Sequence, residues 1–346
     1  MKDRLSQLLQ QPVTDLKKLF GEASYRAYYR LFLKDGSTAI LMAMPEGKMS
    51  VSEEITNAKE KPAELPFINV QRYLKSIGMP VPNIILFSEP DRWLILQDVG
   101  DVKLFDVVHG ADTKTVVGWY KRAIDLLVEL QNRTSDIGHR TSTCVAFERS
   151  FDATLFDWEF DHFWEYYVEI QNPNVQRPSG DQKIFKTETQ KITQVLCQLP
   201  RGFTHRDYQS RNLMVFNKEL YILDFQDALL GPQCYDVVAL LRDSYVDLTA
   251  HLDELLGYYS EKSKTDLKKI RKEFDLQTVQ RKLKDSGRFV FIDRVKKNPN
   301  FLPFIPTSMG YVQQALERLP ECEKLYRLLD GLDCFGPSGL AMTTGK

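Results

Sequence analysis

One short island, residues 201–227, constrains the fold of this 346-residue chain more than any other part of its sequence. It contains two apolar runs joined by a polar turn at 217–219, which is the pattern of an antiparallel hairpin. If the turn centres on residues 217 and 218, pairing places residue 212 opposite residue 223, and a slip of one residue places 213 opposite 224. Either register brings Asn212 and Asp224 together at the open end of the hairpin.

The side chains at that end are suited to phosphoryl transfer. The Asn212 amide oxygen and the Asp224 carboxylate are hard ligands of the kind that Mg²⁺ prefers, and Asp207 lies five residues before Asn212. Phosphoryl transfer needs a carboxylate to receive the proton of the attacking hydroxyl, and metal ions to neutralise the nucleotide phosphates. The spacing H-R-D-x-x-x-x-N at 205–212, with Asp-Phe at 224–225, is the catalytic-loop signature of protein-kinase-like enzymes.

Each of these residues also has an ordinary structural interpretation. Alone, His205 would be a buried histidine bonded to the backbone, Asp207 a turn residue and Asn212 the end of a hairpin. Their combination on one hairpin favours a catalytic site, in which we expect His205 to have a scaffolding role.

Composition excludes several other classes of function. The chain has 46 Lys and Arg against 47 Asp and Glu, a net charge of −1, so no strong field favours nucleic acid or a membrane surface. No run approaches the roughly 20 apolar residues of a membrane span, and the start lacks an apolar signal-peptide core, so we expect a cytoplasmic protein. The five cysteines form no C-x-x-C pair, which leaves a hard cation on oxygen ligands as the expected metal.

The hydropathy pattern divides the chain into a sheet-rich first part and a helical second part. The expected elements are a lead-in helix over 1–19, a hairpin over 24–44, a helix over 69–77, strands at 83–88 and 93–97, and long helices near 115–132, 153–170 and 182–198. These elements define an N-terminal nucleotide-binding lobe over 1–99, a C-terminal catalytic and acceptor-binding lobe over 100–333, and a tail over 334–346 that we expect to be disordered.

The island and the residues after it resemble the aminoglycoside phosphotransferase and choline kinase superfamily. The matching pieces include Gly231-Pro232, Y-D-V-V-A-L-L-R-D at 235–243, and segments at 21–26, 40–42, 78–82 and 94–101. Within the superfamily the chain is most similar to cell-wall sugar kinases, which phosphorylate the anomeric hydroxyl of N-acetylmuramate and N-acetylglucosamine. The resemblance implies an α+β, bilobal protein-kinase-like fold that binds ATP and Mg²⁺ between its lobes, and a place in cell-wall recycling.

By the same resemblance, Asp207 is the catalytic base, and Asn212 and Asp224 hold Mg²⁺. Asp236 would brace the catalytic loop together with His205. Asp236 also begins an apolar helix, where the helix macrodipole favours an acid, so either role is open for it.

The implied nucleotide site has a hinge that grips adenine through its backbone and a loop over the phosphates: Gln97, Asp98 and Val99 in the hinge, and Gly21, Ser24 and Arg26 in the loop. Protein kinases place a phosphate-binding Lys on the third strand, but residues 38–44 contain no Lys. Another cation must replace it, and Arg26, Arg30 and Lys48 are the candidates.

Two features favour a small-molecule acceptor over a protein. Asp224-Phe225 is followed by Gln226 rather than Gly, and Asp236 follows only twelve residues after Asp224. That spacing has no room for the activation and peptide-binding segment of a protein kinase. We infer no obligate protein partner.

Residues 151–170 are the best pointer to the acceptor, because aromatic and acidic residues are interleaved there. Aromatic faces stack on sugar rings, and carboxylates bond hydroxyls or amines. Trp158 and Glu159 are therefore possible acceptor contacts, as is Asp227, which could equally lie in a surface turn. Alternatively, the segment is an amphipathic helix whose core stripe comprises Phe156, Phe160, Phe163 and Tyr167.

The sequence thus predicts transfer of the γ-phosphoryl group of ATP to a hydroxyl of a small molecule, with an amino sugar as the favoured acceptor. An aminoglycoside or choline-type kinase would share every catalytic residue. A nucleotide-binding pseudokinase is the alternative of a different class, because the third-strand Lys is missing.

Overall fold

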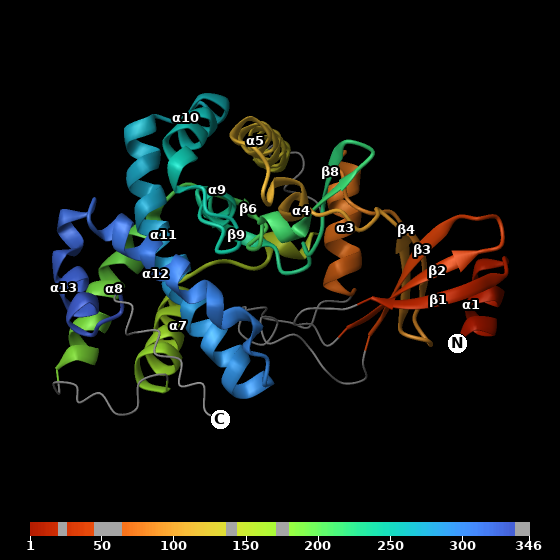
Figure 1. Cartoon of the computed structure of the whole chain (residues 1–346), viewed down its shortest axis with the longest axis horizontal. Coiled ribbons are helices and arrows are strands. Elements are labelled where there is room, and N and C mark those ends of the chain that lie inside the picture. Colours follow the sequence, from red (N-terminus) through yellow and green to blue (C-terminus); the bar gives the residue numbers. More distant parts are fainter. Residues whose placement is uncertain (20–25, 45–63, 136–143, 171–179, 336–346) are drawn as a thin grey trace.

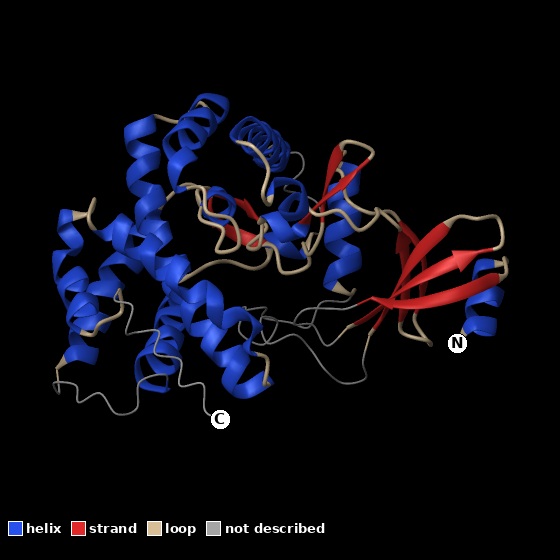
Figure 2. Ribbon diagram, viewed as in Figure 1, coloured by secondary structure: helices blue, strands red, loops and turns tan. Residues whose placement is uncertain are grey.

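The structure, a computed structural model, describes residues 1–19, 26–44, 64–135, 144–170 and 180–335. An antiparallel sheet forms one end of the molecule and a set of helices forms the other, with the short strands of the island among the helices (Figure 1, Figure 2). This is the predicted order, sheet-rich first and helical afterwards. None of the helices in these ranges is both long enough and apolar enough to cross a membrane.

The N-terminal sheet has five antiparallel strands in the order β1-β2-β3-β5-β4. Its strands are β1 (Val13–Leu19), β2 (Ala27–Leu33), β3 (Thr38–Ala43), β4 (Ile84–Ser88) and β5 (Trp93–Gln97). Strands β2 and β3 form the predicted hairpin, and Gly36 takes a φ of 86° in its turn, which a residue with a side chain rarely adopts. The strands predicted at 83–88 and 93–97 are confirmed as β4 and β5.

The prediction of one lead-in helix over 1–19 is only half right. Helix α1 (Lys2–Leu9) ends before Pro12, and Val13–Leu19 pairs with β2 as an edge strand. Proline lacks the N–H that a helix interior needs, so the chain changes structure at that residue.

Helices cover both faces of the sheet. On one face, Leu5 of α1 packs with Leu41 and Ile95. On the other, Ile68 of α3 (Pro66–Ser76) packs with Met42. The alternation of side chains along each strand places these two apolar sets on opposite faces.

The remainder of the chain is mostly helical, and the predicted long helices are present. The helices are α4 (Leu104–Val108), α5 (Thr113–Ser135), α7 (Ala153–Phe163) with its π-helical extension (Trp164–Ile170), α8 (Asp181–Gln198), α9 (Tyr235–Leu241), α10 (Leu252–Ser263), α11 (Leu267–Lys296), α12 (Ile305–Leu316) and α13 (Glu323–Gly331). Two short two-stranded antiparallel sheets lie among them: β6 (Arg201–Thr204) with β9 (Leu229–Pro232), and the hairpin of β7 (Leu213–Phe216) with β8 (Glu219–Ile222).

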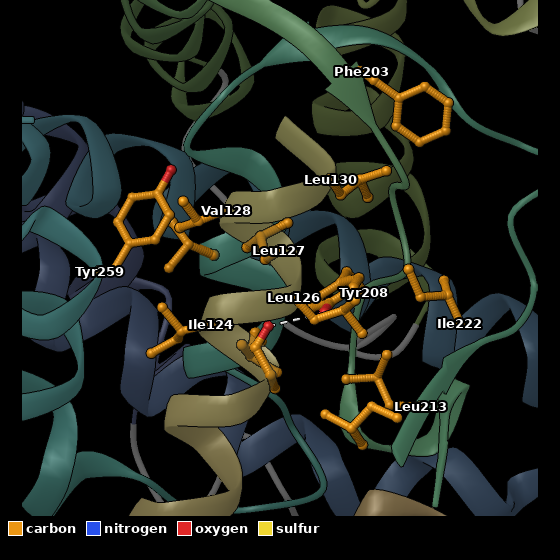
Figure 3. Close-up of a cluster of buried hydrophobic side chains, with 14 of the residues drawn as sticks. Ile124, Leu126, Leu127, Val128, Leu130, Phe203, Tyr208, Leu213, Ile222 and Tyr259 are labelled. Atoms are coloured by element: carbon orange, nitrogen blue, oxygen red, sulfur yellow. Dashed lines mark hydrogen bonds between the residues drawn. The ribbon is translucent and has the colours of Figure 1, made fainter. Parts of the chain in front are cut away.

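Helix α5 lies beside the island and joins it to the core. Its buried side chains pack against Leu213 and Ile222 of the β7–β8 hairpin and against Tyr208 (Figure 3). The hydroxyl of Tyr208 donates to the carbonyl of Ala123 at 2.9 Å. The loop that carries Asp207 therefore has a large aromatic anchor one residue later.

The predicted tail begins at Cys334, which is buried. Its N–H donates to the carbonyl of Leu329 at 2.9 Å, so the chain is still packed on α13 at that point. Residues 336–346 lie outside the described part of the chain.

Gly287 lets α11 and α7 approach closely. A Cβ at this position would lie 2.6 Å from Phe163 Cα and 2.9 Å from the carbonyl oxygen of His162. Both atoms belong to the backbone, so neither can move aside as a flexible side chain could. Any side chain at 287 would therefore push the two helices apart.

We expect Gly287→Ala to lower the free energy of unfolding by roughly 1–3 kcal/mol, the usual effect of overpacking. Gly257→Ala is the matched control, because Gly257 lies inside α10 with nothing within 4 Å of the added Cβ. Alanine there should be neutral or stabilising by about 1 kcal/mol. Urea unfolding followed by circular dichroism measures both, and equal stability of the two variants would contradict the close approach of α7 and α11.

Candidate active site

The β7–β8 hairpin has the first of the two predicted registers. Leu213 pairs with Ile222, and the N–H of Leu223 donates to the carbonyl of Asn212 at 2.9 Å. Asn217 and Lys218 have φ values of 51° and 66°, as a two-residue hairpin turn of the favoured hand requires. Asn212 and the residues after Leu223 therefore meet at the open end of the hairpin.

Asp236 holds the loop that precedes Asp207. Its carboxylate accepts the N–H of His205 at 2.7 Å and the N–H of Arg206 at 3.0 Å. The His205 ring lies 2.8 Å from the carbonyl of Leu223 through Nε2. Both His205 and Asp236 are buried, so a helix, a loop and the hairpin are joined by hydrogen bonds away from solvent. Asp236 also lies in the first turn of α9. The residue at the start of this helix is therefore the same one that bonds the loop, so the two alternatives considered for Asp236 are compatible.

Asp207 is held by a residue that is distant in sequence. Arg281 Nη2 of α11 donates to Asp207 Oδ1 at 3.2 Å, while 40% of the Asp207 side chain stays exposed. Its dense surroundings alone would raise the pKa of Asp207, but Lys284, Arg281 and Arg206 outweigh them and lower it. Asp207 is therefore a carboxylate at neutral pH, fixed on one side and open on another.

Asn212 and Asp224 offer oxygen atoms that fit Mg²⁺. The Asn212 amide nitrogen donates to the backbone carbonyl of Asp207 at 2.9 Å, which commits Nδ2 and leaves Oδ1 as a ligand. Gln226 Nε2 donates to Asp224 Oδ1 at 2.8 Å and lies 3.2 Å from Asp227 Oδ2. In the described ranges no three His, Cys, Asp or Glu side chains gather as a metal site. One carboxylate and one amide suit an ion that takes its other ligands from phosphates and water.

The electrostatics of Asp224 also favour a cation. Although exposed to solvent, Asp224 lies in a dense part of the protein, and this desolvation together with the charges of Asp207 and Asp227 raises its pKa to about 6. Its backbone has a φ of 61°, a conformation that aspartate and asparagine tolerate better than most residues. A divalent cation would relieve the repulsion among these carboxylates.

Arg26 lies close enough to Asp224 and Asp227 to feel their charges. Burial alone would lower the pKa of Arg26, but the charges of Tyr28, Asp227 and Asp224 raise it. The start of β2 thus brings one candidate cation to the predicted metal site. Gly21, Ser24 and Lys48 lie outside the described residues.

Arg30, one of the candidates for a phosphate contact, is instead paired with two aspartates. Its Nε donates to Asp98 Oδ2 at 2.6 Å and its Nη1 to Asp101 Oδ2 at 2.6 Å. Arg30 and Asp98 are both largely buried, with 12% and 7% of their side chains exposed. This network ties β2 to the predicted hinge. Val99 is buried beside it, and the Gln97 N–H donates to Asn83 at 2.8 Å.

The aromatic segment at 153–170 is mainly a core helix. Its predicted stripe is buried, which confirms that interpretation for Phe156, Phe160, Phe163 and Tyr167. Trp158 is exposed by 37% and stacks on His162 with 5.0 Å between ring centroids. Glu159 is buried and accepts from Gln280 Nε2 at 2.6 Å and from Arg206 Nη2 at 3.4 Å.

The sequence analysis missed the contribution of α11. This helix supplies Gln280 to Glu159 and Arg281 to Asp207, and it carries Lys284 close to the same carboxylate. The sequence does carry one sign of it: residues 277–286 are polar except for Val279 and Leu283. Polar residues therefore surround this part of a long helix on all sides, instead of lying on one solvent-facing side. Asp243 was also given no role, although it accepts the N–H of Ser210 at 2.9 Å beneath the loop.

Comparison with known proteins agrees with this geometry. Residues 16–272 match the phosphotransferase enzyme family, and the chain therefore belongs to that family. It is 27% identical over 335 residues to the N-acetylmuramate/N-acetylglucosamine kinase of Pseudomonas aeruginosa, covering 93% of this chain and 89% of that protein. The kinase of the same name from Neisseria meningitidis is 26% identical over 325 residues, covering 91% and 90%.

Solved structures show the same fold. Choline kinase from Streptococcus pneumoniae has a TM-score of 0.59 at 14% identity, covering 92% of this chain and 96% of that chain. An ADP-bound aminoglycoside phosphotransferase has a TM-score of 0.57 at 15% identity, covering 90% and 95%. The predicted α+β, bilobal protein-kinase-like fold class is thereby confirmed, as is the resemblance to this superfamily. The chain is a phosphotransferase.

We expect Arg30→Met to lower the free energy of unfolding by about 3 kcal/mol, because it leaves the buried Asp98 carboxylate without its cation. Arg4→Met is the matched control, since Arg4 pairs with Asp91 at 3.0 Å but keeps 47% of its side chain exposed. An exposed pair contributes less than about 1 kcal/mol. Chemical unfolding measures both, and equal losses would contradict a structural role for the Arg30 network.

We expect Asp224→Asn to raise the melting temperature of the metal-free protein at pH 7 to 8. A carboxyl whose folded pKa is raised to about 6 favours the folded state fully below its ordinary pKa of 3.8, and that stability is lost as the pH rises through 6. The gain from Asp224→Asn should therefore shrink toward pH 4.

Thermal scans in chelator across this pH range test the prediction, with Asp330→Asn on α13 as a distant control. A gain that is the same at pH 4 and pH 8 would show that the Asp224 charge is not its cause.

Proposed function

We propose that this protein transfers the γ-phosphoryl group of ATP, in the presence of Mg²⁺, to the anomeric hydroxyl of an amino sugar, N-acetylmuramate or N-acetylglucosamine. The observation that carries the proposal is the meeting of Asp207, Asn212 and Asp224 at the open end of the β7–β8 hairpin. The acceptor class is supported by relatives of that name that align with about nine-tenths of the chain.

In this mechanism Asp207 receives the proton of the attacking hydroxyl. The sugar oxygen forms a bond to the γ-phosphorus, the bond from that phosphorus to the β,γ-bridging oxygen breaks, and ADP leaves. A lowered pKa makes Asp207 a weak base, which suits a reaction whose loose transition state demands little proton transfer. An anomeric hydroxyl is also more acidic than an ordinary alcohol. Arg281 would fix the carboxylate in the position that the hydroxyl must reach.

The nucleotide would lie between an N-terminal lobe over 1–99 and a C-terminal lobe over 100–333. Asn212 and Asp224 would hold Mg²⁺, whose chemistry is to neutralise charge on the phosphates. The backbone at Gln97, Asp98 and Val99 would hold adenine, and Gly21, Ser24 and Arg26 would face the phosphates. Structural neighbours solved with AMP and with AMP-PNP and Ca²⁺ support a nucleotide site in this fold.

Arg26 is the cation that we propose in place of the missing third-strand Lys. Its charge is already coupled to Asp224 and Asp227, so it could turn to the phosphates when a metal ion neutralises those carboxylates. Arg30 is committed to Asp98 and Asp101. We place the reaction in the cytoplasm, within cell-wall recycling and with no obligate protein partner.

The proposal is tested by phosphorus NMR of ATP and Mg²⁺ incubated in parallel with N-acetylmuramate, N-acetylglucosamine, choline and kanamycin. We expect a sugar 1-phosphate signal with the two amino sugars. Asp207→Ala should lower the rate by roughly 10²- to 10⁴-fold, the usual contribution of a positioned base. Asp161→Asn, an exposed carboxylate on α7, is the control.

Other outcomes separate the alternatives. Transfer to choline or kanamycin in place of the sugars would make the protein an enzyme of the kind seen among its structural neighbours. Intact ATP in every tube, with nucleotide binding retained and cellular function unaffected by Asp207→Asn, would support a pseudokinase.

A further inference from the structure

Helix α11 carries a row of basic residues that starts at Asp207. Arg281, Lys284 and Arg288 are spaced by three and four residues, so they share one face of the helix. Arg281 reaches Asp207 at 3.2 Å. Lys284 lies about one helical turn further along, a rise of roughly 5 Å, and Arg288 lies one turn beyond it. This row is called the α11 basic row below.

Near Asp207, the cations of α11 outnumber the carboxylates that face them. Asp285 is the acid of this helix at the site, and it faces Arg281 at 3.9 Å, Lys282 at 2.7 Å and Lys284 at 3.0 Å. Asp207 is paired with Arg281 at 3.2 Å and also feels the charge of Lys284. Glu159 of α7 is paired with Arg206 at 3.4 Å. Arg281, Lys284 and the neighbouring Lys282 thus share two carboxylates, Asp285 and Asp207.

Lys284 is the member of this group that solvent can reach beside Asp207. Its side chain is 17% exposed, whereas those of Arg281 and Lys282 are 1% and 2% exposed. Its ammonium has three donors, and it donates to Asp285 Oδ1 at 3.0 Å. A ligand that lies against Asp207 therefore meets a positive charge with donors to spare.

Aromatic side chains of α7 and its π-helical extension lie against α11 near this row. Trp158 stacks on His162 and His162 contacts Tyr166, with ring centroids 5.0 Å and 4.6 Å apart, and both His162 and Tyr166 contact Phe291 of α11. The guanidinium of Arg288 lies 4.8 Å from the ring centroid of Phe291. Lys284 and Arg288 also lie close enough to His162 to contribute, after burial, to a pKa lowered to about 4. The aromatic side chains therefore lie beside the Lys284 and Arg288 end of the α11 basic row.

We propose that Lys284, with Arg288 one turn beyond it, binds a carboxylate of the acceptor, so that this site is specialised for an anionic amino sugar. The inference rests on the proposed function. N-acetylmuramate carries a lactyl carboxylate on the ring carbon two positions from the anomeric carbon, and N-acetylglucosamine has a neutral hydroxyl there. The separation of the reacting hydroxyl from that carboxylate is comparable to the helical turn that separates Asp207's partner Arg281 from Lys284.

The same charges disfavour cationic acceptors. A quaternary amine or a polyamine placed against Asp207 would lie beside Lys284 and Arg288 and would be repelled. By this proposal, charge at the site would set the acceptor of this protein apart from that of a choline kinase or an aminoglycoside phosphotransferase, the kinds of enzyme among its fold neighbours.

The test compares kcat/KM for N-acetylmuramate, its methyl ester and N-acetylglucosamine. The ester keeps the size of the lactyl group and removes its charge. We expect the wild-type protein to use N-acetylmuramate roughly 10- to 100-fold better than the ester, as loss of one charge-assisted contact predicts. Lys284→Met should remove most of that preference, and Lys284→Arg should retain it.

Lys268→Met is the matched control, because Lys268 is exposed in the first turn of the same helix. Lys284 also lowers the pKa of Asp207, so some loss with every acceptor is expected, and the selectivity ratio is the deciding quantity. An equal loss with all three sugars, or a loss confined to the KM for ATP, would overturn the proposal.

Binding distinguishes failure of this proposal from failure of the proposed function. Calorimetric titration of the protein with AMP-PNP and Mg²⁺ should show tighter binding of N-acetylmuramate than of its ester, in the wild type but not in Lys284→Met. That result would support the carboxylate site even if no sugar were phosphorylated. Equal affinity for the acid and the ester would overturn it even if both were phosphorylated.

Discussion

The carboxylate of Asp236 is the constraint on which the rest of the site depends. It accepts two consecutive backbone N–H groups, from His205 and Arg206, in the interior of the protein. Arg206 has a φ of 75°, a costly conformation for such a residue, and it persists because its surroundings hold it. Without the carboxylate, two buried donors would lose their acceptor, each at a cost of about 1–3 kcal/mol. The direction of the chain as it enters Asp207 thus follows from one buried acid.

The β7–β8 hairpin and α11 also hold the loop that carries Asp207. The N–H of Val215 donates to Val102 at 2.7 Å and that of Ile222 to Pro80 at 2.8 Å, so the hairpin is bonded to the segments on both sides of the hinge strand β5. Arg281 reaches the same loop from α11 and bonds both the Arg206 carbonyl and the Asp207 side chain. Asp207 is therefore fixed from the sheet side and from the helical side, while Asp224 follows the hairpin with its pKa raised by desolvation and by the charge of Asp207. In the proposed reaction, these fixed charges would supply the electrostatic preorganisation that phosphoryl transfer needs.

Local patterns predicted the hairpin and limited its register to two possibilities, and the two-residue turn at 217–218 selects the first of them. They failed at 13–19, where leucines at helical spacing are also compatible with a strand, and pairing with β2 decided the outcome. They could not assign Arg281, which lies 74 residues from Asp207. Nor could they pair Glu159 with Arg206 and Gln280, which are 47 and 121 residues away. Contacts between distant elements are set by packing, and single-sequence periodicity carries no record of them.

In the proposed reaction, one hairpin end presents a base to the acceptor and oxygen ligands to the metal. A crystal structure with AMP-PNP, Mg²⁺ and N-acetylglucosamine would show whether it does. We expect Mg²⁺ at about 2.0–2.1 Å from Asn212 Oδ1 and an Asp224 carboxylate oxygen. We also expect the anomeric oxygen within about 2.6–3.2 Å of the Asp207 carboxylate. A metal ion held by other residues, or a sugar whose anomeric oxygen lies beyond reach of Asp207, would contradict it.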